Sequence, residues 1–302
     1  MRLALAPIPY YWEKEAVYAF YETIRDTPVD VVYLGETVCA RRHQLRLGDW
    51  LDIGARLRDS GKNVVLSTQI LLESESSLTH LRQIAENDLF TVEANDIGAV
   101  RLLAGKKPFI AGSYLNIYHA RAVALLREWG ATRWVVPVET SRADMSHLLS
   151  ARPEGMEMEV LGYGRLPLAF SARCFTARHH NLPKEDCRFG CLSHRDGLSL
   201  KTREQEDFLV INGTQVLSGK VYTLLHEIPV LEEMGVNVLR INPQSRYTPE
   251  IIGLFSDAVA RRIDVHEAGG HLQAWLPALP CNGYWHGLPG MTYTAPMASM
   301  AK

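Results

Sequence analysis

The sequence predicts an α/β fold, a closed (β/α)8 TIM-like barrel or a variant of it, with residues 1–302 forming a single barrel-like domain. Short β-branched runs alternate with amphipathic helical stretches along the chain, which is typical of a parallel sheet. Several runs are apolar throughout, as strands covered on both faces tend to be. The segment Pro7–Trp12 follows the first run and lacks the glycine-rich phosphate loop of a dinucleotide-binding fold.

Eight apolar runs are candidate strands, and about eight strand–helix units favour a closed barrel over an open sheet. In chain order they are Leu3–Ala6, Val31–Gly35, Val64–Ser67, Phe90–Glu93, Phe109–Gly112, Trp134–Val138, Met156–Leu161 and Val236–Ile241.

Helical periodicity fills the intervals between these runs. The candidate helices are Lys14–Arg25, Trp50–Ser60, Ser76–Ala85, Ala120–Trp129, Ser141–Ala151 and Pro249–Ala268. Ser141 and Thr248 stand at N-cap positions, and Pro249 follows the second of them at the position where proline suits a first helical turn.

One stretch departs from the alternation of strand and helix patterns. Residues 163–203 are rich in Arg, His, Cys, Pro and Gly and show little periodicity. The runs Phe208–Ile211 and Gln215–Leu217 then flank Asn212-Gly213, which predicts a hairpin. We therefore expect a Cys-rich, cluster-binding insertion at residues 163–219, late in the barrel.

The charge and composition of the chain disfavour several classes of function. The formal net charge is −2, whereas general nucleic-acid binders usually carry a basic excess. No segment reaches the roughly 18 apolar residues of a membrane span, and the N-terminal run is interpreted as a strand rather than a signal peptide. We expect a cytoplasmic protein with reduced thiols, in which five cysteines indicate metal binding or chemistry more than disulfides.

Polar residues follow several candidate strands, where a barrel carries its functional groups. Glu36, Glu93, Asn116, Glu139 and Arg240 are the candidate substrate-binding residues. Gln69, Asn95, Asp96 and Glu159 occupy similar positions. The alternative for each is a helix cap or a member of a buried pair.

Three cysteines, Cys174, Cys187 and Cys191, lie within 18 residues on the irregular segment. Closely spaced thiolates on such a loop suit a metal, and iron–sulfur clusters usually take four of them. Zinc is the alternative, because it accepts Cys and His ligands and three histidines are nearby, His179, His180 and His194. The spacing alone matches neither a ferredoxin run nor a zinc ribbon.

A fourth ligand has two candidates, Cys39 and Cys281, and each could instead be a small buried hydrophobe. We favour Cys39, because it follows the second strand at the barrel mouth, within reach of an insertion from a later strand. Arg41 and Arg42 beside it could offset the negative charge of a thiolate-bound cluster or form a solvated basic turn.

Residues 159–174, EVLGYGRLPLAFSARC, resemble the signature E-V-F-V-H-G-A-L-C-I-S-Y-S-G-R-C of the collagenase-like peptidase family. The matching positions are Glu159, Gly164, Leu166, Ser171, Arg173 and Cys174. The family His, first Cys and Gly are replaced by Tyr163, Pro167 and Ala172, so that one thiolate is missing from the signature.

The chain resembles the ubiquinone-biosynthesis branch of the family, which lacks the same signature cysteine. In that branch a cysteine in the motif G-E-x-V-C completes the set of four thiolate ligands, and the matching residue here is Cys39. Further segments resemble this branch over nearly the whole chain, namely YLGETVCARR, LGDWL, VLST, VEANDIG, VVPVE, SARCFTAR and CNGYW. The resemblance implies a [4Fe–4S] cluster whose metal ligands are Cys39, Cys174, Cys187 and Cys191.

The resemblance also implies partners and a reaction. These are a heterodimer with a UbiU-type homologue, a UbiT-type lipid-binding accessory protein, and O2-independent hydroxylation of an aromatic ubiquinone precursor. A non-catalytic iron–sulfur or zinc scaffold subunit is the main alternative. A peptidase is disfavoured because no triad or metallopeptidase spacing is visible. An RNA-base hydroxylase is disfavoured by the weakly acidic balance.

Overall fold

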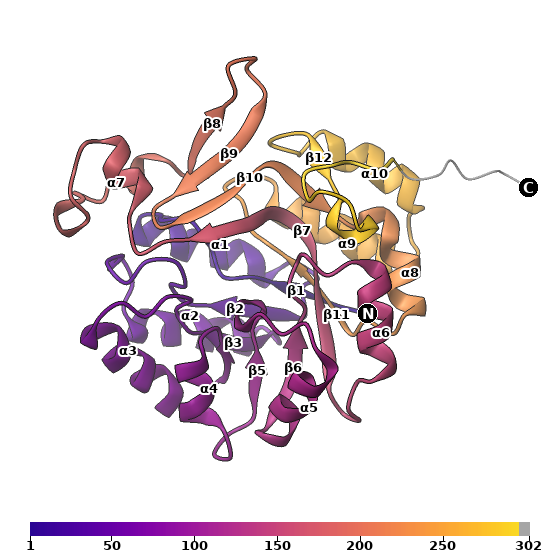
Figure 1. Ribbon diagram of the computed structural model, residues 1–302, viewed down its shortest axis with the longest axis horizontal. Coiled ribbons are helices and arrows are strands. Elements are labelled where there is room, and N and C mark those ends of the chain that lie inside the picture. Colours follow the sequence, from indigo (N-terminus) through magenta and orange to yellow (C-terminus); the bar gives the residue numbers. More distant parts are fainter. Residues whose placement is uncertain (296–302) are drawn as a thin grey trace, which may run out of the picture.

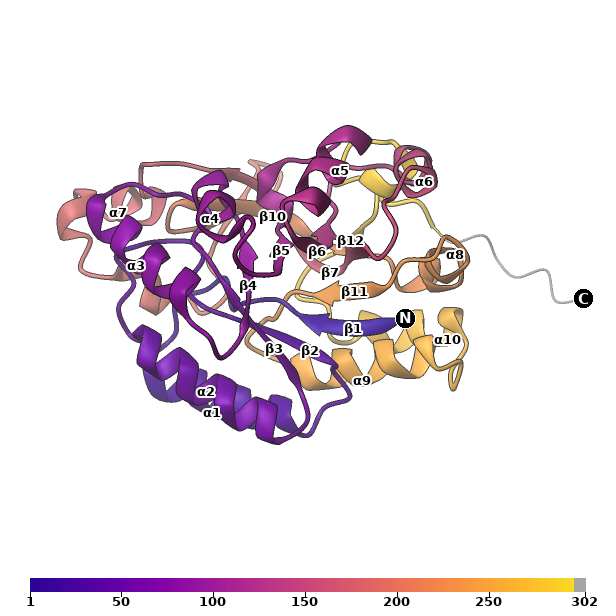
Figure 2. The same ribbon diagram turned by 90° about the horizontal axis from the view of Figure 1, so that it is seen from below.

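The computed structural model describes residues 1–295, and these contain a closed barrel of eight parallel strands (Figures 1 and 2). The strands are β1 (Arg2–Leu5), β2 (Val31–Leu34), β3 (Asn63–Ser67), β4 (Thr91–Ala94), β5 (Phe109–Ala111), β6 (Ala131–Val135), β7 (Glu157–Phe170) and β11 (Val238–Ile241). Each pairs with the next, and β11 closes the ring by pairing with both β1 and β7. The predicted fold is confirmed, and each predicted strand has a counterpart.

Alternation along the strands divides the apolar side chains into two layers. In β2, Val32 and Leu34 join the large cluster beneath the helices, whereas Val31 and Tyr33 join a small cluster with residues of five other barrel strands. Because successive strand side chains point to opposite faces, the small cluster fills the barrel interior. This explains why β2, VVYL, carries no charged side chain on either face.

Helices cover the outside of the barrel (Figure 2). They are α1 (Lys14–Arg25), α2 (Leu47–Asp59), α3 (Glu75–Glu86), α4 (Ile97–Leu103), α5 (Ala120–Glu128), α6 (Arg142–Ser150), α8 (Ile228–Glu233), α9 (Thr248–Val259) and α10 (Val265–Gln273). Ser141 caps α6 by accepting a hydrogen bond from the Asp144 amide. The short helices α4 and α8 were not foreseen from the sequence.

The helix predicted at Pro249–Ala268 is wrong as a single helix, because α9 and α10 are separate. Arg261 adopts a left-handed φ of +56°. The amides of Arg261 and Arg262 bond back to the carbonyls of Ala258 and Asp257, which is a Schellman ending. Thr248 is likewise not the N-cap: Tyr247 occupies that position, and Thr248 is already helical.

An antiparallel ribbon continues from the barrel. β7 pairs with β10 (Gln215–Thr223), which pairs with β9 (Asp207–Asn212), which pairs with β8 (Leu198–Lys201). The two-residue strand β12 (Pro280–Cys281) pairs with β10. The hairpin is present, but Asn212 pairs with Gln215 as a strand residue, so Gly213 and Thr214 form the turn. Gly213 takes a φ of +66°, which glycine tolerates best.

The Cys-rich segment connects β7 to β8 and extends to the side of the barrel (Figure 1). It contains the short helix α7 (Phe175–His179) and 3-10 turns at Lys184–Asp186 and Gly190–Ser193. Within residues 1–295, none of the helices has the length and hydropathy needed to cross a bilayer.

Candidate functional site

A network of charged side chains lies inside the barrel. The Arg240 guanidinium donates to Glu159 through Nε and to Glu93 Oε1 through Nη2, the latter at 2.7 Å. Arg133 donates to Glu159 Oε2 at 3.1 Å, and the Tyr33 hydroxyl donates to the same oxygen at 2.6 Å. Because each of these groups is buried, the pairing offsets their desolvation.

The network fixes charge states as well as positions. Burial by itself would raise the pKa of Glu159, but Arg240 and Arg133 outweigh it and hold that pKa below its usual value. The Arg240 guanidinium also stacks 4.1 Å from the centre of the Tyr33 ring. Glu159 is therefore an anion that orients two arginines, rather than a free acid or base.

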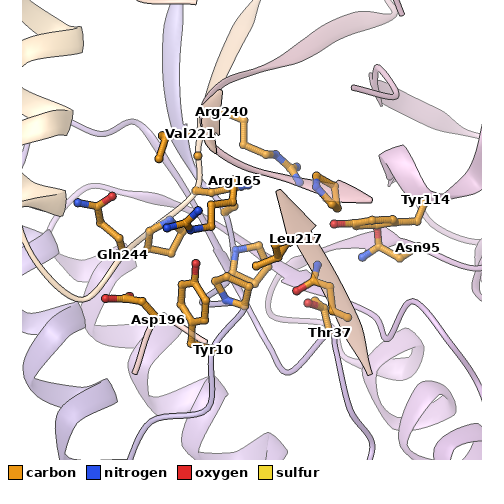
Figure 3. A pocket seen from close by; sticks show the side chains of 18 of the residues that line it. Tyr10, Thr37, Asn95, Tyr114, Arg165, Asp196, Leu217, Val221, Arg240 and Gln244 are labelled. Carbon is orange, nitrogen blue, oxygen red and sulfur yellow. The ribbon is translucent and has the colours of Figure 1, made fainter. Parts of the chain in front are cut away.

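Above this network lies a cavity of about 60 Å³ at the barrel mouth (Figure 3). Its wall includes Glu93 and Arg240 from the barrel and Arg165 from the extension of β7. Tyr10 and Tyr114 close opposite sides of it (Figure 3). Arg165 donates to the carbonyl of Ser218 at 2.8 Å, which anchors its guanidinium to the ribbon.

A second hollow of about 350 Å³ adjoins this cavity and shares Tyr114 and Arg240 with it. Asn116 and Glu139 line it, together with the apolar side chains of Leu168 and Phe170. The Tyr114 and Phe170 rings meet edge to face at 5.2 Å. This volume lies within the range of small-molecule sites, and its aromatic wall suits a flat ring.

Four of the five predicted substrate-binding residues thus line the two connected hollows, and Glu36 does not. Glu36 accepts hydrogen bonds from the amides of Val38 and Cys39 at 2.9 and 3.1 Å and lies 3.5 Å from Arg42. It therefore shapes the loop that carries Cys39.

Two other polar residues at the strand ends form local hydrogen bonds. Asp96 caps α4 by accepting from the Gly98 amide, and Asn95, which also lines the smaller cavity, donates to the Thr68 carbonyl. Sequence reasoning missed the contributions of Tyr10 and Arg165 to the mouth. Arg165 follows the predicted strand within the irregular stretch, so that only the extension of β7 reveals its place.

A second polar site surrounds Cys39. Burial raises the pKa of the Cys39 thiol to about 11, although Arg42 opposes the shift, and Cys174 is near enough to contribute to it. Burial also raises the pKa of Cys191, again opposed by Arg42, while Cys174 and Cys187 act on the same thiol. The four cysteines predicted as ligands therefore lie in one electrostatic neighbourhood.

The fifth cysteine lies elsewhere. Cys281 is fully buried on β12, where it pairs in register with Tyr222, and burial raises the pKa of its thiol to about 12. The histidines near the other thiols contact one another: the rings of His180 and His194 stack at 5.8 Å. Among the described residues, no group of three or more Cys, His, Asp or Glu side chains is arranged to hold a metal ion.

Comparison with known proteins places this architecture in a family. The sequence profile of peptidase family U32 matches residues 15–273, which is most of the chain. The chain belongs to peptidase family U32. Among solved structures, the U32 peptidase Mk0906 is similar over 81% of this chain and 93% of its own, with 13% identity and a TM-score of 0.45.

A protein named as a dihydrodipicolinate synthetase from Pseudomonas aeruginosa is similar over 99% of this chain and 93% of its own. Its identity is 11% and its TM-score is 0.50, which reflects the shared fold.

In this U32 protein, the segment that resembles the family signature is β7 and the turn after it. The segment begins at Glu159 in the charged interior, contributes Arg165 to the cavity wall, and ends at Cys174. β7 and the short turn after it therefore connect the barrel mouth to Cys174.

Proposed function

We propose that this U32 protein is a UbiV-type iron–sulfur subunit of an O2-independent hydroxylase acting on an aromatic ubiquinone precursor. The observation that supports this most is the set of charge interactions that links Cys39, Cys174, Cys187 and Cys191, two of which, Cys39 and Cys191, also interact with the buried Arg42. Four cysteine thiolates are the ligand set that iron–sulfur clusters usually take.

The two candidate metal groups need different spacings of the sulfur atoms. A zinc ion binds all its ligands directly, at about 2.3 Å for sulfur. In a four-iron cluster each thiolate binds its own iron, so the sulfurs stand farther apart. When bound, such a cluster supplies one-electron chemistry.

The connected hollows at the mouth are the proposed substrate site. Glu93 and Arg240 are bonded to each other, so they shape the floor. Asn116 and Glu139 are the candidate polar contacts in the larger hollow, whose wall also contains Phe170. In the proposal, an aromatic precursor binds there, delivered by a UbiT-type lipid-binding protein to a cytoplasmic heterodimer with a UbiU-type homologue.

Anaerobic purification tests the cluster. We expect brown protein with about four iron and four sulfide per chain. Serine in place of Cys39, Cys174, Cys187 or Cys191 should lower the iron content, whereas Cys281→Ser, the matched control, should keep it. Colourless wild-type protein with stoichiometric zinc would reject the assignment.

A scaffold role is the second candidate, and the pairing of the charged groups at the mouth favours it. In that case a UbiU-type partner performs the chemistry. Asn116→Ala and Glu139→Gln distinguish the two. Hydroxylation lost while the heterodimer persists supports a substrate site here, and unchanged hydroxylation supports the scaffold.

A further inference from the structure

Another hollow, of about 760 Å³, lies between the loops that follow β2 and β3. Its wall is made of the loop after β2, parts of α2 and α3, and Gln69 beyond the end of β3. It shares no lining residue with the two hollows at the barrel mouth. It is therefore a separate place at which a small molecule could bind.

Two helices begin at this hollow. Leu47 and Gly48 are the first two residues of α2, Ser76 and Ser77 are the second and third residues of α3, and all four line the wall. The first amides of a helix have no partner within the helix, and the helix dipole places partial positive charge there. Outside the neighbouring backbone, no described atom lies within 4 Å of the position that a Cβ atom on Gly48 would take. The first turn of α2 therefore borders open space, which suits an anion.

The charged side chains on the wall are consistent with an anion. Arg46, the N-cap residue of α2, adds a cation. Asp49 in the first turn of α2 accepts from Lys14 at 2.6 Å and from the Arg46 amide at 2.9 Å, and it does not line the hollow. Among the described lining residues, Glu36 is the only acidic one, and it is held by two amides of its own loop and by Arg42 at 3.5 Å.

Gln69 provides an independent indication of a ligand. It lines the hollow and is only 7% exposed, yet its Oε1 atom is buried without a hydrogen-bond partner among the described residues. A buried polar group without a partner costs free energy. A turn about the last side-chain torsion exchanges the oxygen and the amino group, so the amide can meet a hydroxyl group as donor or as acceptor.

We propose that this hollow binds a sugar phosphate, with the phosphate group at the first turns of α2 and α3 beside Arg46 and a sugar hydroxyl group at Gln69. A phosphate group presents acceptor oxygens in several directions, which suits two helix N-termini and a guanidinium together. The volume exceeds what a phosphate group alone fills and leaves space for the sugar. The inference goes beyond the proposed function, because the site needs no metal and lies outside the proposed substrate site.

The experiment is a calorimetric titration of the full-length protein with ribose 5-phosphate, inorganic phosphate and ribose. Arg46→Gln removes the cation at the hollow, and Gln69→Leu removes the amide. Arg142→Gln is the matched control, because Arg142 is an exposed arginine at the first turn of α6 that does not line this hollow. Thermal unfolding is measured for each variant.

The wild type should bind ribose 5-phosphate more tightly than inorganic phosphate, and ribose more weakly than either. Arg46→Gln should weaken the binding of both phosphates about tenfold, since a hydrogen bond to a charged group is lost. Gln69→Leu should weaken the binding of ribose 5-phosphate and leave that of inorganic phosphate unchanged. Arg142→Gln should behave like the wild type.

Wild-type protein that binds neither phosphate overturns the inference, and so does binding that Arg46→Gln leaves unchanged. Inorganic phosphate or ribose binding as tightly as ribose 5-phosphate would reject the sugar phosphate as the ligand. If Gln69→Leu fails to fold, Arg46→Gln still decides, because the Arg46 side chain is exposed and its loss should not disturb the core. None of these outcomes bears on the iron content, so the proposed function stands or falls separately.

Discussion

At the scale of single residues, the interior of the barrel is held by balanced charge rather than by apolar packing alone. Glu159 is fully buried and accepts hydrogen bonds from Arg240, Arg133 and Tyr33. Buried pairs of this kind contribute little compared with apolar packing, but removing one partner leaves an uncompensated charge in a dry interior.

Glu159→Gln should therefore destabilise the protein by about 3–5 kcal/mol, because two arginines lose their anionic partner. Glu157→Gln is the matched control: Glu157 also pairs with Arg133, but its side chain is 37% exposed. Exposed pairs contribute at most about 1 kcal/mol. Urea unfolding measures both variants, and equal losses would contradict the assigned role.

The lowered pKa of Glu159 also predicts an acid dependence. The fold favours the carboxylate, so this contribution to stability is present above the ordinary glutamate pKa of about 4.3 and is lost as the pH falls toward the lower folded value. The urea midpoint of the wild type should fall across this window. Glu159→Gln should show a shallower fall, and parallel curves would count against the lowered pKa.

At the scale of elements, chain ends and turns decide where helices stop. α9 and α10 are separated by a Schellman ending in which Arg261 has a left-handed φ, a conformation that favours glycine. The sequence there shows no glycine, so the helical periodicity runs on without a visible stop. Arg261 takes the left-handed position that glycine usually fills at the end of a helix, and the backbone hydrogen bonds of the Schellman ending form around it.

Arg261→Gly should stabilise the protein by about 1 kcal/mol, because it relieves the left-handed strain. Arg261→Ala is the control, since it removes the same exposed side chain, including its 3.5 Å pair with Glu232, while keeping a Cβ atom. Thermal unfolding should place glycine above both alanine and the wild type. Equal melting of the glycine and alanine variants would sink this explanation.

At the scale of the whole molecule, the turn of the β9–β10 hairpin joins segments far apart in sequence. The Thr214 hydroxyl donates to the Val38 carbonyl at 2.8 Å, and the Gly213 amide donates to the Thr176 hydroxyl at 3.0 Å. The turn therefore touches the loop of Cys39 and the helix that follows Cys174. In this way the turn ties two cysteine-bearing segments to the ribbon.

Thr214→Val should cost about 1 kcal/mol, the usual contribution of a hydrogen bond, and should lower the iron content of the purified protein. Ser146→Ala is the control, because Ser146 bonds only within its own helix on an exposed face. Metal analysis and urea unfolding together check the prediction. Full iron content in a destabilised Thr214→Val protein would show that the turn supports the fold without orienting the thiols.

The local sequence pattern was sufficient to predict the barrel. Each strand is a short apolar run with its own boundary signals, and the alternation with helices fixes a parallel arrangement. The hairpin was likewise visible in the Asn212-Gly213 pair, although its turn lies one residue later. The clustering of Glu93, Asn116, Glu139 and Arg240 at the mouth follows from that fold, because the ends of parallel strands converge.

By itself, the sequence determined the repeating pattern of the fold and the residue types available for chemistry. Tertiary structure decided which of those residues meet. Glu36 became a support for the Cys39 loop, Glu159 became the anchor of a charged interior, and Arg42 became a buried link from the Cys39 loop to Pro9 and Asn212. Strand and helix patterns depend on residues that are close in the sequence, whereas burial and charge pairing arise only when distant segments pack together.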